Sequence, residues 1–301
     1  MATTVRETIK EIIRKHLLEG KGKCFGQCLT AVGWVGGTLP ELYEEDGMVE
    51  LSMADVAGGG IVVGAALESR PIYTVRYQGF LWYNAISIVN YAAKSKELWG
   101  RPCTLLLRGI AMEGGIGPVA GSSHHSLLHR MPGIKIISPM TPKEYQFAYD
   151  SYMSEDDPYY ISEHRKSYDN TDEFENVIHS EADFTIFPIS ITRFEMKKVK
   201  QLAEESNLKV NIIHQVWIKP FVINSIWKTS LESLKFGGLV TDDDYVEGVA
   251  SSMANELSLA ASKRVWTMGL EPRTAGFHPS VDNLPPSAEK IVDKLKCIKY
   301  S

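Results

Sequence analysis

Short β-branched, apolar runs alternate with longer amphipathic stretches over most of the chain. This alternation predicts parallel strands joined by crossover helices, because each helix must bring the chain back to the same edge of the sheet. In the first half, the apolar runs predict strands at residues 71–75, 103–107, 134–138 and 159–162, and helical spacing predicts helices at residues 84–98 and 142–153.

A polar stretch at residues 167–181 has little periodicity and predicts a linker. The alternation then resumes, with strands expected at residues 184–190, 209–215, 238–241 and 264–268, and helices at residues 193–206, 224–234 and 246–261. The sequence therefore predicts two α/β domains, at residues 1–175 and 176–301.

Composition and charge exclude several classes of protein. A chain of 301 residues with 44% hydrophobic and 23% charged residues is typical of a globular protein, and a net charge of -5 argues against a nucleic-acid partner. The longest apolar run, residues 58–67, is much shorter than the ~20 residues of a membrane span. Charges interrupt the N-terminal stretch, so no signal peptide is expected. Four cysteines without framework spacing indicate free thiols in a reducing cytoplasm.

Sequence motifs of self-contained active sites are missing. The chain has no G-x-x-x-x-G-K-[ST], G-x-G-x-x-G, H-E-x-x-H or G-x-S-x-G motif. An α/β protein usually binds its ligand at the strand ends, often through a phosphate-binding loop. The site is therefore expected to be unusual or incomplete.

Several blocks of the chain resemble one family. They are ELSMADVAGGGIVVGAAL from Glu50, then RPIYTVRYQGF, NAISIVNYAAK, HRMPGIKIISPMTP and DDPYYISEHRKSYD, in the family's order. They resemble the β subunit of the decarboxylating component of 2-oxo acid dehydrogenases (pyruvate, branched-chain or acetoin type) and, more distantly, the second half of transketolases. Residues 238–257 and 265–295 resemble the family's C-terminal domain.

The resemblance implies a fold, a cofactor and a partner. The fold would be a doubly wound, parallel-sheet pyrimidine-binding domain followed by a smaller transketolase C-terminal-like α/β domain. The β subunit would hold the aminopyrimidine ring of thiamine diphosphate, and an α-type subunit would bind the diphosphate through Mg²⁺, in an α2β2 assembly. This chain lacks the Gly-Asp-Gly…Asn motif of the α subunit, so no metal ligands are expected in it.

The family places a glutamate beside the pyrimidine ring, and Asp55 occupies that position here. An aspartate has the same chemistry with about 1.5 Å less reach. The alternative is that Asp55 caps the helix that begins with the glycine run, since aspartate is a common N-cap residue. Both roles are compatible.

Phe80 aligns with the family's aromatic residue that stacks on the pyrimidine. Tyr77 is a second candidate contact, with packing or a subunit contact as the alternative. Gly58 begins a triple glycine that suits a close backbone approach. Gln27 stands where the family has acidic residues, which removes charge from the expected site.

The loop that faces the substrate departs from the family. Ala120 replaces the family's histidine, and His124 and His125 follow four and five residues later. One of them is a candidate acid or base, because histidine titrates near neutral pH. The alternative is that both belong to a partly exposed helix start with interface contacts.

The resemblance therefore implies thiamine-dependent cleavage or formation of a carbon–carbon bond next to a carbonyl, with a 2-oxo acid as the expected substrate. Two alternatives stay open. One is the C-terminal subunit of a split transketolase or sugar carboligase acting on a ketose, which the His124–His125 pair would suit. The other is a non-catalytic regulatory or scaffold subunit, which Asp55 and Ala120 would suit as remnants of a decayed site.

Overall fold

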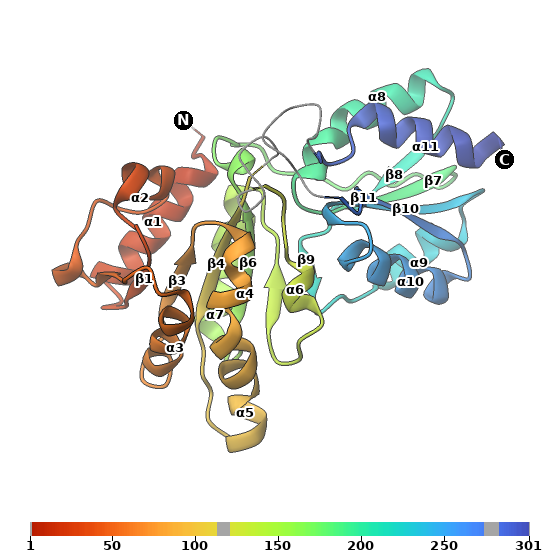
Figure 1. Cartoon of the computed structure of the whole chain (residues 1–301). Coiled ribbons are helices and arrows are strands. Elements are labelled where there is room, and N and C mark those ends of the chain that lie inside the picture. Colours follow the sequence, from red (N-terminus) through yellow and green to blue (C-terminus); the bar gives the residue numbers. More distant parts are fainter. Residues whose placement is uncertain (1, 113–120, 274–282, 301) are drawn as a thin grey trace. The chain divides into compact units, whose positions relative to one another are not determined.

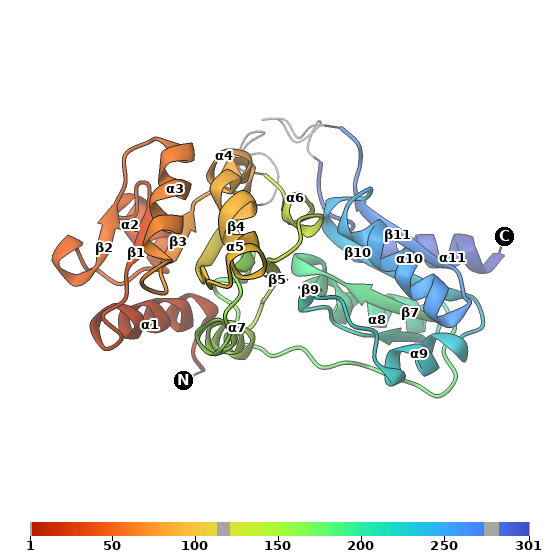
Figure 2. The same ribbon diagram turned by 90° about the horizontal axis from the view of Figure 1, so that it is seen from below.

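The computed structural model describes residues 2–112, 121–273 and 283–300. The described chain forms two compact units, the first ending at Glu173 and the second beginning at Phe174 (Figures 1 and 2). No helix within these ranges is long and apolar enough to cross a membrane. All four cysteines are free.

A parallel sheet forms the centre of the first unit. Its strands run in the order β2-β1-β3-β4-β6-β5. They are β1 (Cys24–Gly26), β2 (Met48–Glu50), β3 (Ile72–Val75), β4 (Leu106–Ala111), β5 (Lys135–Ile137) and β6 (Tyr159–His164).

The central strands are buried along their whole length. Every residue of β3, β4 and β6 is buried, which explains why their sequences read as continuous apolar runs rather than as alternating ones. Strand β4 begins at Leu106, later than expected. The preceding residues 103–105 lie outside the strand but are buried, so they have the apolar pattern of a strand.

Helices cover both faces of this sheet (Figure 2). Helices α1 and α7 pack together on one face, and α3 packs with α4 on the other. Thr141 caps α7 by accepting from the Glu144 amide, with proline in the first turn as the sequence predicts. The helices of the unit are α1 (Val5–Leu18), α2 (Ala31–Gly37), α3 (Asp55–Ala65), α4 (Leu81–Asn84), α5 (Ala93–Trp99), α6 (Ser126–His129) and α7 (Pro142–Ser154).

The helix expected at residues 84–98 differs from the structure. Helix α4 ends at Asn84 instead of beginning there, and a π-helical turn (Ile88–Ala92) connects it to α5. The Asn84 side chain donates to the Phe80 carbonyl four residues earlier. The same amide also makes a tertiary hydrogen bond to the Asp55 side chain, which helical spacing alone does not reveal.

The second unit is a smaller α/β layer. Its parallel strands follow the order β11-β10-β7-β8, with α8 and α11 packed on one face and α9 and α10 on the other (Figure 1). The elements are β7 (Phe184–Pro188), α8 (Met196–Glu205), β8 (Val210–Ile212), β9 (Trp217–Lys219), α9 (Ser225–Glu232), β10 (Gly237–Tyr245), α10 (Val249–Ala261), β11 (Val265–Leu270) and α11 (Ala288–Tyr300).

A buried ion pair joins β4 to β6 inside the first unit. The Arg108 guanidinium donates to both carboxylate oxygens of Glu163, at 3.1 and 2.8 Å, and to Thr38 Oγ1 at 3.1 Å. The two charged side chains are 2% and 0% exposed. Glu163 thus has a structural role, because a buried carboxylate requires a charged partner and further hydrogen bonds.

We expect Arg108→Met to reduce the free energy of unfolding by about 3–5 kcal/mol, because it leaves the Glu163 charge buried without a cation. Urea unfolding measures this loss. Arg101→Gln is the matched control, since the Arg101–Glu68 pair is 54% and 83% exposed and should contribute about 0–1 kcal/mol. Equal losses in the two variants would contradict the structural role of Arg108.

Candidate functional site

A pocket of ≈ 180 Å³ lies at the point of the first unit's sheet where the order of successive strands reverses. Residues that follow β1 and β3 line it, and the chain order places β2 on one side of β1 and β3 on the other. Ligands of open α/β sheets bind at such switch points, outside the carboxyl ends of the strands. The lining residues are Gln27, Cys28, Met53, Asp55, Tyr73, Thr74, Val75, Arg76, Tyr77, Phe80 and Asn84.

Three residues expected from the sequence, Asp55, Tyr77 and Phe80, meet in this pocket. Asp55 is the first residue of α3, whose N-cap is Ala54, and no side chain caps that helix. The alternative role of Asp55, as the N-cap of this helix, is therefore wrong. Its carboxylate Oδ1 instead accepts a hydrogen bond of 2.8 Å from Asn84 Nδ2.

Asn84 connects Asp55 to a buried tyrosine. The Tyr73 hydroxyl donates to Asn84 Oδ1, and Asn84 Nδ2 also donates to the Phe80 carbonyl at 3.0 Å. Asn84 is 2% exposed and Tyr73 is 0% exposed. Burial, and then the nearby Asp55 charge, raise the pKa of Tyr73 well above its usual value. The tyrosine is therefore a neutral donor at physiological pH.

Two glycines of α3 allow this contact. A Cβ on Gly59 would lie 2.1 Å from the Asn84 carbonyl oxygen, and one on Gly58 would lie 2.7 Å from the Tyr73 hydroxyl. Both distances are too short for any side chain. Gly58, expected to allow a close backbone approach, thus makes room for Tyr73, while Gly59 lets α4 approach α3.

The aromatic wall of the pocket comes from the segment after β3. The Tyr77 and Phe80 rings lie 6.0 Å apart between centroids, tilted by 50°. The Arg76 guanidinium carbon lies 5.7 Å from the centre of the Tyr77 ring, within the range of a cation–π contact. Each of these rings offers an aromatic face on which a heterocyclic ring could stack.

The opposite wall follows β1. Gln27 Nε2 is buried and has no hydrogen-bond partner within the described ranges. A buried donor without a partner is costly, and a ligand acceptor in the pocket would satisfy it. Cys28 Sγ lies 3.6 Å from Met53 Sδ. The lining side chains of this wall, Gln27, Cys28 and Met53, are uncharged.

The two histidines lie outside the lining of this pocket. His125 is fully buried, and its Nδ1 lies 3.0 Å from Ser162 Oγ. The His124 backbone amide donates to Gln78 Oε1 at 2.6 Å. His125 directly precedes α6 and so lies at a helix start, but it is buried, so the expectation that this start is partly exposed is wrong for His125. Ala120 falls outside the described residues.

Gln78 ties the histidine segment to the pocket. Its Nε2 donates to Gly109 O and Ser162 Oγ at 3.1 and 3.0 Å, while its Oε1 accepts from His124. The side chain is 1% exposed. It therefore fixes the turn that carries Phe80 (Gln78–Phe80) against the ends of β4 and β6.

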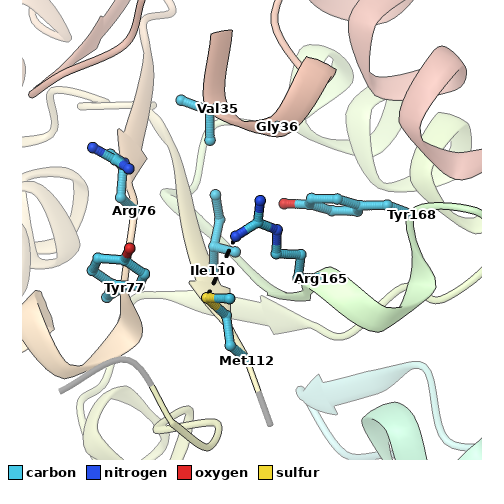
Figure 3. A pocket seen from close by; sticks show the side chains of 8 residues that line it. All are labelled: Val35, Gly36, Arg76, Tyr77, Ile110, Met112, Arg165 and Tyr168. Carbon is cyan, nitrogen blue, oxygen red and sulfur yellow. Dashed lines mark hydrogen bonds between the residues drawn. The ribbon is translucent and has the colours of Figure 1, made fainter. Parts of the chain in front are cut away.

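A second, smaller pocket adjoins the first. Arg76 and Tyr77 line both pockets, so they form a shared wall. Figure 3 shows Arg165 extended into the second pocket beside Ile110.

Residues 19–171 match the family described as transketolase, pyrimidine binding domain. The chain belongs to this family. The fold class and the family expected from the sequence are thereby confirmed. The pocket with Asp55 and Phe80 lies inside the pyrimidine-binding domain.

Curated relatives and a solved structure agree with this membership. The chain is 26% identical over 144 residues to the 2-oxoisovalerate dehydrogenase subunit beta of Bacillus subtilis, covering 43% of this chain and 41% of that protein. It is 24% identical over 214 residues to the pyruvate dehydrogenase E1 component subunit beta of Acholeplasma laidlawii, covering 64% of each. The chain thus spans less than two thirds of the length of these two relatives.

A solved structure described as a split gene transketolase, in an inactive beta4 tetramer, shares the fold. The TM-score is 0.72 at 13% sequence identity, over 99% of this chain and 98% of that one. At this identity the likeness concerns the fold alone.

The sequence did not single out Asn84 and Tyr73 as site residues. Tyr73 lies in an apolar strand, and Asn84 only marked a helix start in the pattern. The available signal was Asn84 itself, a polar amide in the largely aromatic and apolar run of residues 80–89. A buried amide requires a specific hydrogen-bond partner.

We expect Gly59→Ala to destabilise the first unit by about 1–3 kcal/mol, because the added methyl group must push α4 away from α3. Gly60→Ala is the matched control. Its Cβ would meet Ser87 Oγ at 3.6 Å, an ordinary contact, so it should stabilise the helix by about 0.5–1 kcal/mol. Urea unfolding measures both. A neutral Gly59→Ala would contradict the close approach of the two helices.

Proposed function

We propose that the chain is the β-type subunit of a two-subunit, thiamine-diphosphate-dependent enzyme. The enzyme cleaves or forms a carbon–carbon bond next to a carbonyl, with a 2-oxo acid as the donor and an acyl or aldehyde unit passed to an acceptor in the cytoplasm. The observation that supports this best is the Asp55 carboxylate, hydrogen-bonded by Asn84 in a pocket that also contains the Phe80 ring.

The described residues fit the aminopyrimidine ring. The pocket provides a carboxylate (Asp55), an aromatic surface (Phe80 and Tyr77) and an unsatisfied buried donor (Gln27 Nε2). A flat ring with nitrogen acceptors and an amino donor complements these groups. No described residue of the pocket forms a phosphate cradle, which agrees with a ring site rather than a diphosphate site.

Each residue has a definable task in this proposal. Bound thiamine diphosphate supplies a carbon nucleophile. The Asp55 carboxylate would accept a hydrogen bond from the ring and so favour one protonation state of the ring. Asn84 keeps that carboxylate in place, and Phe80 orients the ring. His124 and His125 remain proposed acid or base groups, with Gln78 linking their segment to the pocket.

The partner would complete the site from the α3–α4 face. Large apolar side chains on these helices are exposed, including Val56 at 51%, Trp82 at 65% and Tyr83 at 56%. A hollow lined by Asp55, Val56 and Tyr83, together with Ala54 and Ala57, continues this surface. Exposed apolar patches next to a ligand pocket are typical of interfaces. We propose that an α-type chain with the diphosphate and Mg²⁺ ligands covers this face in an α2β2 assembly.

The second candidate is the C-terminal subunit of a split transketolase or sugar carboligase. The His124–His125 pair, whose segment Gln78 ties to the pocket, is the observation that favours it. A regulatory or scaffold role is less well supported, since Asp55 and Phe80 both line the pocket.

We expect Asp55→Asn to slow proton–deuterium exchange at the thiazolium carbon of the cofactor by about a hundredfold or more in the assembled complex. The amide keeps the shape of the carboxylate but has no negative charge and cannot act as an acid or base. Solution NMR measures the exchange. Asp150→Asn, an exposed change on α7, is the control and should exchange like the parent.

Asp55→Glu tests the dimensions of the pocket in the same assay. Asn84 holds the shorter side chain, so an added methylene should be overpacked and slow the exchange. If Asp55→Asn and Asp55→Glu both exchange at the parent's rate, Asp55 has no role in activating the cofactor, and the proposed function loses its main support.

We also expect the purified chain to bind thiamine diphosphate weakly or not at all, because it supplies contacts only to the ring. Titration calorimetry with and without an α-type chain measures the difference. Micromolar binding by this chain without any partner would refute the two-subunit arrangement.

A further inference from the structure

The Asp55 carboxylate depends on a single neighbour. Asp55 is half-buried at the start of α3, and among the described residues only Asn84 is hydrogen-bonded to its side chain, through Nδ2 at 2.8 Å. A side chain that acts on a ligand must be held to within about 0.5 Å by the residues around it. The position of Asp55 is therefore set by whatever holds the Asn84 amide.

Two groups hold that amide, one at each end. The Phe80 carbonyl accepts from Nδ2 at 3.0 Å, and the Tyr73 hydroxyl donates to Oδ1. The Phe80 bond is local, since Phe80 is the N-cap of α4, the helix that ends at Asn84. Tyr73 instead lies in β3, a strand that is buried along its whole length. Tyr73 thus links the amide to the rigid centre of the sheet.

The Tyr73 hydroxyl fits beside α3 because Gly58 has no side chain. A Cβ at this position would lie 2.7 Å from the hydroxyl oxygen, too close for any side chain. Tyr73 is 0% exposed, and Asn84 is the one hydrogen-bond partner of its hydroxyl in the part of the chain that the structure describes. Each link of the chain from the sheet to the pocket therefore consists of one hydrogen bond.

We propose that Tyr73 is a positioning residue, which holds the Asp55 carboxylate at the ring site by fixing the Asn84 amide. Tyr73 lines the ring pocket, but its hydroxyl is bonded to Asn84, so it acts on the ring through Asp55 rather than directly. The effect on the cofactor rests on the proposed function, whereas the hydrogen-bond chain itself does not.

The first test follows the carboxylate by NMR in the purified chain, without cofactor or partner. Aspartate is isotope-labelled at the carboxyl carbon, and the Asp55 signal is identified by its loss in Asp55→Asn. Tyr73→Phe removes the hydroxyl and keeps the ring, so it should shift this signal. Tyr152→Phe is the matched control and should leave the signal in place. Tyr152 is also 0% exposed, and its hydroxyl donates to the Pro71 carbonyl at 3.2 Å.

A second variant moves the hydroxyl without changing a polar residue. Gly58→Ala places a methyl group against the Tyr73 hydroxyl, so it should also shift the Asp55 signal. Gly60→Ala should not, since its Cβ would meet Ser87 Oγ at an ordinary 3.6 Å. An unchanged signal in the Tyr73→Phe or the Gly58→Ala chain, or equal shifts in the two control chains, overturns the positioning role.

The second test is a double-mutant cycle in the assembled complex, with proton–deuterium exchange at the thiazolium carbon as the readout. Tyr73→Phe should slow the exchange about tenfold or more, because a small displacement of a positioned group is costly. In a chain that already carries Asp55→Asn, it should have less than about a twofold further effect, since no carboxylate is left to position. Equal slowing in both backgrounds means that the hydroxyl acts through the fold as a whole, and overturns the proposal.

The two tests separate this inference from the proposed function. Should Asp55→Asn exchange at the parent's rate, the proposed function fails, and the carboxylate signal of the purified chain decides the positioning role. Should Asp55→Asn slow the exchange while Tyr73→Phe leaves it unchanged, the proposed function stands and the positioning role is overturned.

Discussion

The close approach of α3 to α4 is the constraint on which the site depends. Gly59 lets the Asn84 backbone come within a distance that no side chain would allow, and Gly58 does the same for the Tyr73 hydroxyl. Only at this separation can Asn84 reach the Asp55 carboxylate. The triple glycine is therefore a packing requirement, and it explains how an aspartate can be held firmly in this pocket.

Periodicity and the family resemblance predicted different parts of the molecule. From residue 71 onward, most strands and helices followed from periodicity, because strands buried on both faces and amphipathic helices have clear patterns. The strands β1 and β2 were not predicted, since three residues are too few to show a pattern. Asp55, Tyr77 and Phe80 were found through the resemblance, and they do line one pocket. Asn84 was not found, since its role depends on a partner 29 positions away in the chain. The buried contacts of His125 were equally invisible, because a histidine in a loop has no periodicity to read.

The geometry of the first unit places two kinds of surface side by side. The pocket walls after β1 and β3 are concave and carry the polar groups. The neighbouring α3–α4 surface is apolar and exposed. The two surfaces meet at Asp55, which lines both the pocket and the apolar hollow beside Val56 and Tyr83.

The hydrogen-bond chain through Asn84 has a fixed direction. Both protons of Asn84 Nδ2 go to groups that accept, the Phe80 carbonyl and Asp55 Oδ1. The amide oxygen must then face the Tyr73 hydroxyl, which donates to it. A rotated amide would set its oxygen against the Phe80 carbonyl and the carboxylate, with no proton between them. Oδ1 of Asp55 therefore already accepts one hydrogen bond, and Asn84 leaves Oδ2 open to a donor in the pocket.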